Sequence, residues 1–177
     1  GQYEAATLLH ALGPAFETGE KCRIAAAFGA VGAMRQRLVE DAPCDLVIEA
    51  VIEDLEVKQK VFAELDRRGA RVFRHPTSPV CWEHTSLGRP RPMLEFLFDT
   101  TRAVVDLILS GTVAAHPGIE FIIPHAGATL PMVADRINVF AMLFDAEVDV
   151  LRDLGRLHFD LAGYPLPRQL DALLTLT

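Results

Sequence analysis

Cysteine is scarce in this sequence, and long apolar runs and positive charge are scarce as well. Cys22, Cys44 and Cys81 are the three cysteines in 177 residues, and their spacing fits no metal or disulfide motif. We therefore expect three free thiols in a reducing compartment and predict a cytoplasmic protein. No run approaches the roughly 18 apolar residues of a membrane span, and the first residues lack a basic-then-apolar leader pattern, so we expect no membrane segment.

The charge and the length of the chain indicate which partners it can bind and what kind of domain it forms. A formal net charge of −7 excludes non-specific binding to nucleic acid or to anionic membranes. Half of the residues are hydrophobic, so a chain of 177 residues can bury a core without metal or disulfide support. We predict one α/β domain over residues 1–177.

Strand-like and helix-like patterns alternate along the whole chain. Strands are predicted at residues 22–28, 45–52, 71–74, 119–123 and 157–161. Helices are predicted at residues 3–12, 31–40, 54–67, 93–110, 130–144 and 167–174. Strands separated by helices predict parallel βα units. The fold class is α/β, as a partial (β/α) barrel or a five-stranded doubly wound sheet.

Two histidines follow two of these strands. His75 comes directly after the strand at 71–74, and His125 comes just after the strand at 119–123. Because the carboxyl ends of parallel strands share one edge of a sheet, both imidazoles are expected at the same edge. Imidazole is the commonest metal ligand and the usual general base near neutral pH. The residues alone leave open a second interpretation, in which both histidines are partly buried and only cap strand ends.

Other candidate positions are less specific. Asp160 lies at the end of the last predicted strand, where it could orient His125 or cap the following turn. The turn at Gly29–Ala33 precedes a predicted helix, whose N-terminus could bind an oxyanion. The loop at 76–92 is rich in proline and glycine, and loops of this length are more often functional than merely connecting.

Several separated motifs in the C-terminal part occur together in one known family. They are Val72–Pro76, Leu109–Gly111, His116–Gly118, Pro124–Pro131, Asp135–Ile137 and Phe159–Ala162. From about residue 69 to the C-terminus the chain resembles the amidohydrolase-related decarboxylases, of the aminocarboxymuconate-semialdehyde decarboxylase-like type. The resemblance implies a (β/α)₈ barrel that holds one divalent metal, usually zinc.

The same resemblance implies roles for individual residues. His75 matches a metal ligand, and His125 matches the histidine that activates metal-bound water or polarises the substrate, so His125 is predicted as a ligand or an acid–base group. Asp160 is a candidate for orienting it. The implied activity is metal-dependent decarboxylation or hydrolysis of a small carboxylate substrate, and association as a homo-oligomer is expected because relatives often form dimers.

The chain departs from the family at three points. It contains no H-x-H pair, which supplies two metal ligands in the family, and the family's last aspartate ligand is expected beyond Thr177. Ala128 stands where a glycine is common. We therefore expect the missing ligands to come from a second chain or from unrecognised positions, with Glu83 and His84 as candidates.

The N-terminal part resembles other families. Residues 9–48 are similar to molybdate-type periplasmic binding proteins, and residues 45–66 are similar to 3-hydroxyacyl-CoA dehydrogenases. The glycines at 29–32 lack the G-x-G-x-x-G spacing that NAD binding needs. An internal junction near residues 68–70 follows. The alternative function is a non-catalytic binding module with an oxyanion site at Gly29–Ala33, or a chimeric or designed chain without enzymatic activity.

Overall fold

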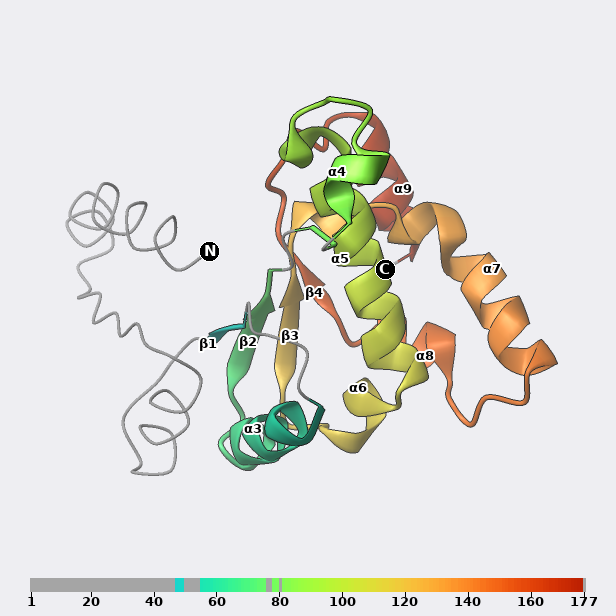
Figure 1. The fold of residues 1–177 in the computed structure, drawn as a ribbon. Helices are drawn as coiled ribbons and strands as arrows, with labels where there is room; N and C mark the ends of the chain where they lie inside the picture. The colour runs from blue at the N-terminus through green and yellow to red at the C-terminus, as the bar shows by residue number, and fades with distance from the viewer. Residues whose placement is uncertain (1–46, 50–54, 76–77, 80, 177) are drawn as a thin grey trace. The chain divides into compact units, whose positions relative to one another are not determined.

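The computed structural model describes residues 47–49, 55–75, 78–79 and 81–176 (Figure 1). The chain divides into two compact units, residues 1–43 and 44–177, and all described residues lie in the second unit. The elements predicted before residue 44 and the Gly29–Ala33 turn lie outside the described residues. The junction predicted near residues 68–70 falls within the second unit and stays a prediction.

The second unit contains a sheet of four short parallel strands. They are β1 (Val47–Glu49), β2 (Arg71–Arg74), β3 (Glu120–Ile123) and β4 (His158–Phe159). Val72 of β2 is in register with Val47 of β1 and with Phe121 of β3. The α/β class, the parallel pairing and the last four predicted strands are confirmed.

The order of the strands distinguishes between the two predicted architectures, the partial (β/α) barrel and the doubly wound sheet. In the sheet the strands lie as β1-β2-β3-β4, the order in which they occur in the chain. A doubly wound sheet reverses its strand order at a switch point. A (β/α) barrel instead adds each strand on the same side of the preceding one. Over the described residues the sheet therefore progresses as an arc of a barrel does.

Helices connect the strands. The long ones, all predicted from the sequence, are α3 (Leu55–Arg67), α5 (Arg91–Leu109), α7 (Leu130–Leu143) and α9 (Arg168–Leu176). The short ones are α4 (Trp82–Thr85), α6 (Thr112–Ala115), α8 (Val150–Leu154) and the 3₁₀ turn η1 (His125–Gly127). The short elements were not predicted, because three to five residues are too few to show a helical period.

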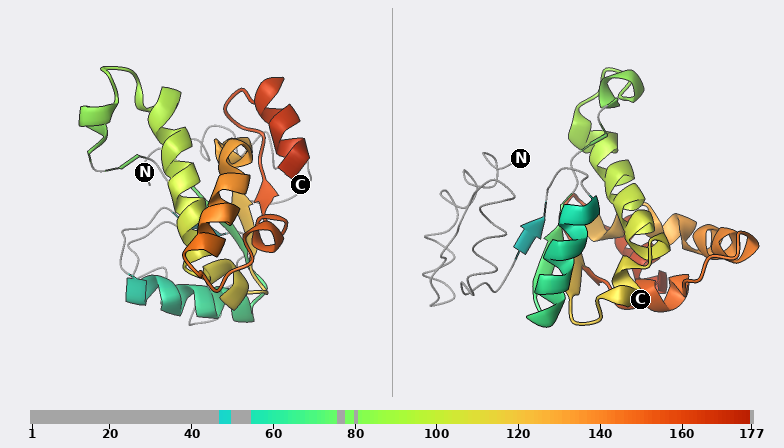
Figure 2. Two further views of the ribbon diagram at one scale, coloured as in Figure 1. Left: turned by 90° about the vertical axis from the view of Figure 1, so that its right-hand side faces the viewer. Right: turned by 60° about the horizontal axis from the view of Figure 1, so that its bottom comes forward.

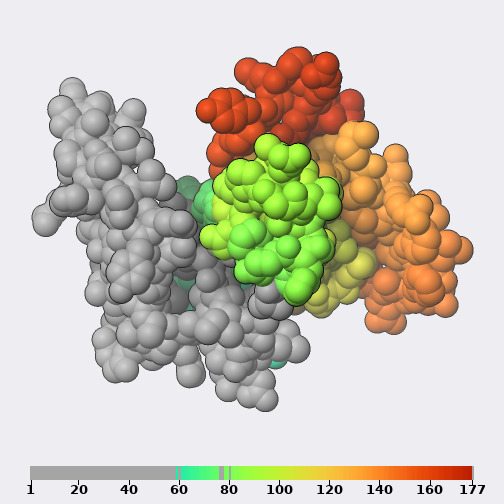
Figure 3. Space-filling model, turned by 45° about the horizontal axis from the view of Figure 1, so that its top comes forward, coloured from blue at the N-terminus to red at the C-terminus, as the bar shows by residue number. Residues whose placement is uncertain are grey.

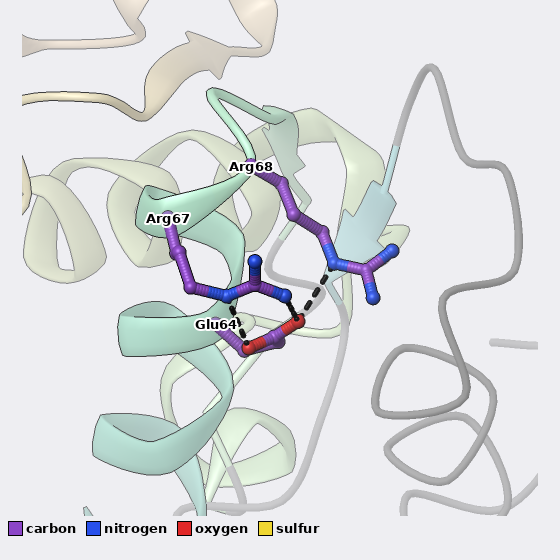
Figure 4. Close-up of polar contacts among 3 residues, drawn as sticks. All are labelled: Glu64, Arg67 and Arg68. Atoms are coloured by element: carbon purple, nitrogen blue, oxygen red, sulfur yellow. Dashed lines mark hydrogen bonds and ion pairs between the residues drawn. The ribbon is translucent and has the colours of Figure 1, made fainter.

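The end of α3 shows how local sequence sets a helix boundary. Gly69 has a φ of +60° just past the helix, and its amide donates to the carbonyl of Asp66 at 3.0 Å. Inside the last turns, the carboxylate of Glu64 accepts hydrogen bonds of 2.7 Å from both Arg67 and Arg68 (Figure 4). The bonds from Arg67 and then Arg68 lower the pKa of Glu64 from 4.5 to about 2.

The core joins the helices to the sheet. Buried side chains from five elements form it: Phe62, Leu65, Val72, Val104, Ile108, Phe121, Ile123 and Leu154. The rings of Phe62 on α3 and Phe121 on β3 meet edge to face, with centroids 5.8 Å apart. Such burial stabilises the parallel strands, whose faces must both be covered.

The helices α4 and α9 lie at the carboxyl edge of the sheet, where both candidate histidines follow their strands (Figure 1). The carboxyl ends of β2 and β3 point to the end of the unit where α4 and α9 lie, whereas α3 and α6 lie at the opposite end (Figure 1). The segment that carries α4 stands beyond the first turn of α5 (Figure 2). The guanidinium of Arg91 on α5 lies 5.1 Å from the ring centroid of Trp82, which joins α4 to α5.

Two further sequence predictions concern the described residues. None of the described helices is both long and apolar enough to cross a membrane. Cys81 is a free thiol and is exposed, as predicted for that cysteine, whereas Cys22 and Cys44 lie outside the described residues.

Candidate active site

The two predicted histidines meet at the carboxyl edge of the sheet. His75 directly follows β2, and His125 opens the η1 turn two residues after β3. Because β2 and β3 are adjacent and parallel, the imidazoles come together, with ring centroids 5.1 Å apart and planes inclined at 68°. The sequence prediction that both emerge at one edge is confirmed.

An aromatic side chain from α5 completes this cluster. The ring centroid of Phe96 lies 6.4 Å from that of His75 and 6.2 Å from that of His125. Phe73 of β2 packs on the other side of His75 at 5.8 Å. The two imidazoles therefore have apolar neighbours, and His125 is only 9% exposed.

The η1 turn presents His125 through an unusual backbone. His125, Ala126, Gly127 and Ala128 have φ values of +59°, +50°, +74° and +54°. Glycine is favoured at position 127 by its positive φ of +74° and because a β-carbon there would lie 3.1 Å from the ring of Phe159, a tight contact. A run of left-handed residues persists only where surrounding contacts hold it.

Asp160, just after β4, holds the start of this turn. One oxygen of its carboxylate accepts the backbone amides of His125 at 2.9 Å and of Ala162 at 3.0 Å. The carbonyl of Asp160 accepts the amide of Ala126 at 3.1 Å. Asp160 thus holds the main chain of His125 and also caps its own turn, as the second interpretation expects, whereas an orienting role toward the His125 ring stays a prediction.

Gln169 of α9 holds the other side of the turn. Its side-chain amide donates to the carbonyl oxygens of His125 and Ala128, the latter at 3.1 Å. The turn is thus held by hydrogen bonds from two elements that are distant in sequence. Nothing in the local sequence around Gln169 signals this contact.

Ala128 occupies a backbone conformation that suits glycine. Its φ of +54° and ψ of −118° place the β-carbon in steric conflict with its own backbone. We expect Ala128→Gly to raise the free energy of unfolding by about 1 kcal/mol, because relief of strain exceeds the entropic cost of glycine. Urea unfolding measures this change. Ala63→Gly, at an exposed position within α3, is the control and should lower stability by about 1 kcal/mol, whereas a loss of stability in Ala128→Gly would contradict the assigned strain.

Within the described part of the chain, the imidazole of His125 forms one hydrogen bond. The hydroxyl oxygen of Thr100 on α5, which is fully buried, lies 3.0 Å from Nδ1. Burial lowers the pKa of His125, and the positive charge of a protonated His75 lowers it further, whereas the Asp160 carboxylate acts in the opposite direction. The folded protein therefore favours neutral His125 near pH 7.

This lowered pKa predicts a pH dependence of stability. As the pH falls below about 6.5, the unfolded chain protonates His125 before the folded protein does. The contribution of His125 to the free energy of unfolding is therefore present above about pH 6.5 and is lost as the pH falls toward the lowered folded pKa. Urea midpoints of the parent should fall more steeply than those of His125→Asn between about pH 7.5 and 5.5; parallel slopes would contradict the shift.

The described residues supply only part of a metal site. Imidazole is a ligand for first-row divalent metals, but protein zinc sites use three or four ligands. Among residues 55–75, 78–79 and 81–176, no group of three or more His, Cys, Asp or Glu side chains could hold an ion. Glu83 and His84 are exposed on α4 and join no such group. An ion held by these histidines would therefore need further ligands from outside the described residues.

Thr100, like Gln169, is a site residue that the sequence analysis does not predict. The buried residues of α5 follow a helical period through Thr100, Val104, Leu107 and Ile108. A hydroxyl in phase with a buried apolar face needs a hydrogen-bonding partner, and this was the available signal. The identity of the partner, on a turn 25 residues away, had no signal in the local pattern.

Comparisons with known proteins support the resemblance to the decarboxylases. The 6-methylsalicylic acid decarboxylase of Penicillium expansum is 43% identical over 76 residues, which are 43% of this chain and 24% of the relative. A solved structure described as amidohydrolase II is 30% identical, with a TM-score of 0.72, and the match covers 99% of this chain and 62% of that one. The chain thus spans about a quarter of the curated relative and less than two thirds of the solved protein.

A more distant structure shares the fold. It is a 5-carboxyvanillate decarboxylase from Novosphingobium aromaticivorans, in complex with manganese and 4-hydroxy-3-methoxy-5-nitrobenzoic acid. It is 13% identical with a TM-score of 0.70, and the match covers 99% of this chain and 57% of that one. At this identity the likeness concerns the fold alone.

The segment before residue 78 has a separate match. Residues 18–77 match the family model of the 3-hydroxyacyl-CoA dehydrogenase NAD binding domain, in agreement with the weaker resemblance predicted for residues 45–66. The likeness to the 6-methylsalicylic acid decarboxylase and to the amidohydrolase II structure agrees with the resemblance to amidohydrolase-related decarboxylases.

Proposed function

We propose that this chain acts as a metal-dependent decarboxylase or hydrolase of the amidohydrolase superfamily on a small aromatic carboxylate. The observation that carries the proposal is the pair of imidazoles, 5.1 Å apart at the carboxyl ends of two adjacent strands. The 43% identity to a decarboxylase of a hydroxybenzoate supports decarboxylation over hydrolysis.

His75 is proposed as a metal ligand, and His125 as a ligand or an acid–base group. The sequence resemblance favours zinc, and the manganese in the distant relative supports a divalent ion more generally. A bound divalent ion would polarise the substrate's oxygen atoms and stabilise negative charge. Its remaining ligands would come from residues outside the described ranges or from another chain.

The described residues supply positioning and an apolar environment. Asp160 and Gln169 hold the main chain of His125, and Thr100 contacts its ring, so the imidazole is fixed before a substrate arrives. Phe96 flanks both imidazoles and offers an apolar face to an aromatic ring. A carboxylate that leaves water for such a surface loses the hydration that stabilises its charge, which favours loss of carbon dioxide.

The alternative functions have less support. The oxyanion site at Gly29–Ala33 lies outside the described residues, and neither the curated relatives nor the solved structures favour a binding module. The dehydrogenase-like segment lacks the G-x-G-x-x-G spacing, so the proposal includes no NAD step. Cytoplasmic location and homo-oligomer formation stay predictions.

Carbon dioxide release tests the proposal directly. Purified protein loaded with Mn²⁺ or Zn²⁺ is incubated with 6-methylsalicylate, 2,6-dihydroxybenzoate and benzoate as separate substrates. We expect release from at least one hydroxybenzoate, and slower or no release from benzoate, which lacks the ring hydroxyl that can share the metal. An absence of turnover of every hydroxybenzoate by metal-loaded protein would contradict the proposal.

A further inference from the structure

The contact between Thr100 and His125 determines more than the position of the ring. Thr100 is completely buried in the middle of α5, and its hydroxyl oxygen lies 3.0 Å from Nδ1 of His125. Among the described residues, Nδ1 is the only hydrogen-bonding partner recorded for this hydroxyl. The neighbouring Thr101 differs, since its hydroxyl bonds to the carbonyl of Leu97 at 2.9 Å and to Thr129 at 2.7 Å.

The direction of this hydrogen bond follows from the cost of a buried donor. If Nδ1–H donated to Thr100, the hydroxyl hydrogen would be left in the core with no acceptor among the described groups. An unsatisfied buried donor costs about 1–3 kcal/mol. If the hydroxyl donates to the lone pair of Nδ1, the hydroxyl hydrogen has a partner. The remaining hydrogen on Nε2 can then be solvated, because Nε2 is not among the fully buried side-chain atoms without a partner in the described residues. The second arrangement is therefore favoured, and it requires that neutral His125 carries its proton on Nε2.

Contacts around His125 keep its ring in the orientation that places Nδ1 against Thr100. Asp160 holds the amide of His125, and Gln169 holds its carbonyl, so the side chain starts from a fixed point. Phe96 packs beside the ring, and Gly163 lies close to its Cδ2 edge, where a β-carbon would come within 3.6 Å. A flipped ring would place Cδ2 rather than Nδ1 against the buried hydroxyl and would leave that hydroxyl without a partner.

We infer that Thr100 is a positioning residue that holds His125 in the Nε2–H tautomer, so that His125 offers a hydrogen-bond donor to an anionic group and is not a metal ligand. A ligating nitrogen must present a lone pair, and here the lone pair of the ring is occupied by Thr100. The tautomer follows from the contacts alone, whereas the task of donating to a substrate carboxylate rests on the proposed function. The inference decides between the two roles that the sequence leaves open for His125.

Nitrogen NMR of the full chain, labelled with ¹⁵N-histidine, tests the tautomer without any need for activity. At about pH 8, where imidazole is neutral, we expect Nδ1 of His125 to resonate as an unprotonated nitrogen that accepts a hydrogen bond, and Nε2 as a protonated one. The same spectrum is recorded after loading with Zn²⁺, which is diamagnetic and, unlike Mn²⁺, does not broaden the resonances. Nε2 of His125 should stay protonated. A protonated Nδ1, or an Nε2 that loses its proton when Zn²⁺ is added, would overturn the inference.

Three variants separate positioning from a merely structural role. Thr100→Val keeps the side-chain shape and removes the hydroxyl, so the Nδ1 resonance should shift toward that of a nitrogen without a hydrogen bond. Thr100→Ser restores the hydroxyl and should restore the parent Nδ1 resonance, even where packing is weakened. Thr101→Val is the matched control, and it should leave the Nδ1 resonance unchanged, because that hydroxyl bonds elsewhere. An Nδ1 resonance that is unchanged in Thr100→Val would overturn the assignment.

This readout is independent of the proposed activity. If metal-loaded protein fails to decarboxylate hydroxybenzoates but the tautomer is Nε2–H, the positioning by Thr100 holds and the proposed function fails. If turnover is present but Nδ1 is protonated, the proposed function holds and the positioning by Thr100 fails.

Discussion

Replacing His125 with asparagine is expected to lower kcat/KM for decarboxylation by a factor on the order of 10² to 10³, the loss seen when a preorganised donor is removed. The asparagine amide occupies the position of Nδ1 and can still contact Thr100, but it removes Nε2, which is the nitrogen proposed to face the substrate. His125→Gln is the complementary change, because its amide approaches the position of Nε2 and loses the Nδ1 contact.

The comparison of these two variants assigns the function to one nitrogen. His125→Gln should retain more activity than His125→Asn if donation from the Nε2 position is what the substrate needs. Activity is measured by carbon dioxide release from a hydroxybenzoate, after circular dichroism has shown that each variant is folded. Equal activity of the parent and His125→Asn would contradict a role for this ring in the reaction.

Removing the carboxylate of Asp160 is expected to lower the free energy of unfolding by roughly 3 kcal/mol, because hydrogen bonds to a charged group contribute about 1.5–3 kcal/mol each. Asp160→Ala leaves the amides of His125 and Ala162 without their acceptor, in a turn whose left-handed residues depend on such contacts. Asp160→Asn keeps an oxygen acceptor without the charge, so its loss should be smaller, about 1 kcal/mol.

Urea unfolding of the two variants measures these losses. The matched control is Asp135→Ala, since Asp135 is an exposed aspartate on α7 with no hydrogen bond recorded to its side chain among the described residues. Surface changes of this kind usually alter stability by no more than about 0.5 kcal/mol. A loss in Asp160→Ala no larger than in this control would show that the carboxylate does not hold the η1 turn.

Much of the fold follows from periodicity in the sequence. The bounds predicted for β2, β3 and α5 agree with the structure to within two residues. The two strands are short runs centred on β-branched or aromatic residues, and α5 shows an apolar stripe at helical spacing. The pairing of His75 with His125 followed from the same pattern, since parallel strands align their carboxyl ends.

The remaining features depend on contacts between distant residues. Thr100 and Gln169 meet the η1 turn from two different helices, and no local pattern indicates which atoms they reach. The sequence shows only that Ala128 stands where a glycine is common, whereas the backbone, with a φ of +54° and a ψ of −118°, gives the reason that glycine is favoured there. α4 and α6 are single turns, and the loop around α4 has no period that could have marked them.

The segment that carries α4 is held to α5 by side-chain contacts. The segment that carries α4 comes to the front when the carboxyl edge is turned toward the viewer (Figure 3). Arg91 stacks on Trp82 and lies 3.5 Å from the hydroxyl of Ser78, so this segment has contacts of its own that fix it to α5.

Metal content of the purified chain, measured by elemental analysis after equilibration with Zn²⁺ or Mn²⁺ and removal of the excess, tests the central claim most directly. The account predicts about one ion per chain in the parent, loss of that ion in His75→Ala, and its retention in His125→Asn. Loss in both variants would make His125 a ligand and contradict the role assigned through Thr100. A parent chain that holds no ion, or a His75→Ala variant that holds as much as the parent, would contradict the proposed metal-dependent site itself.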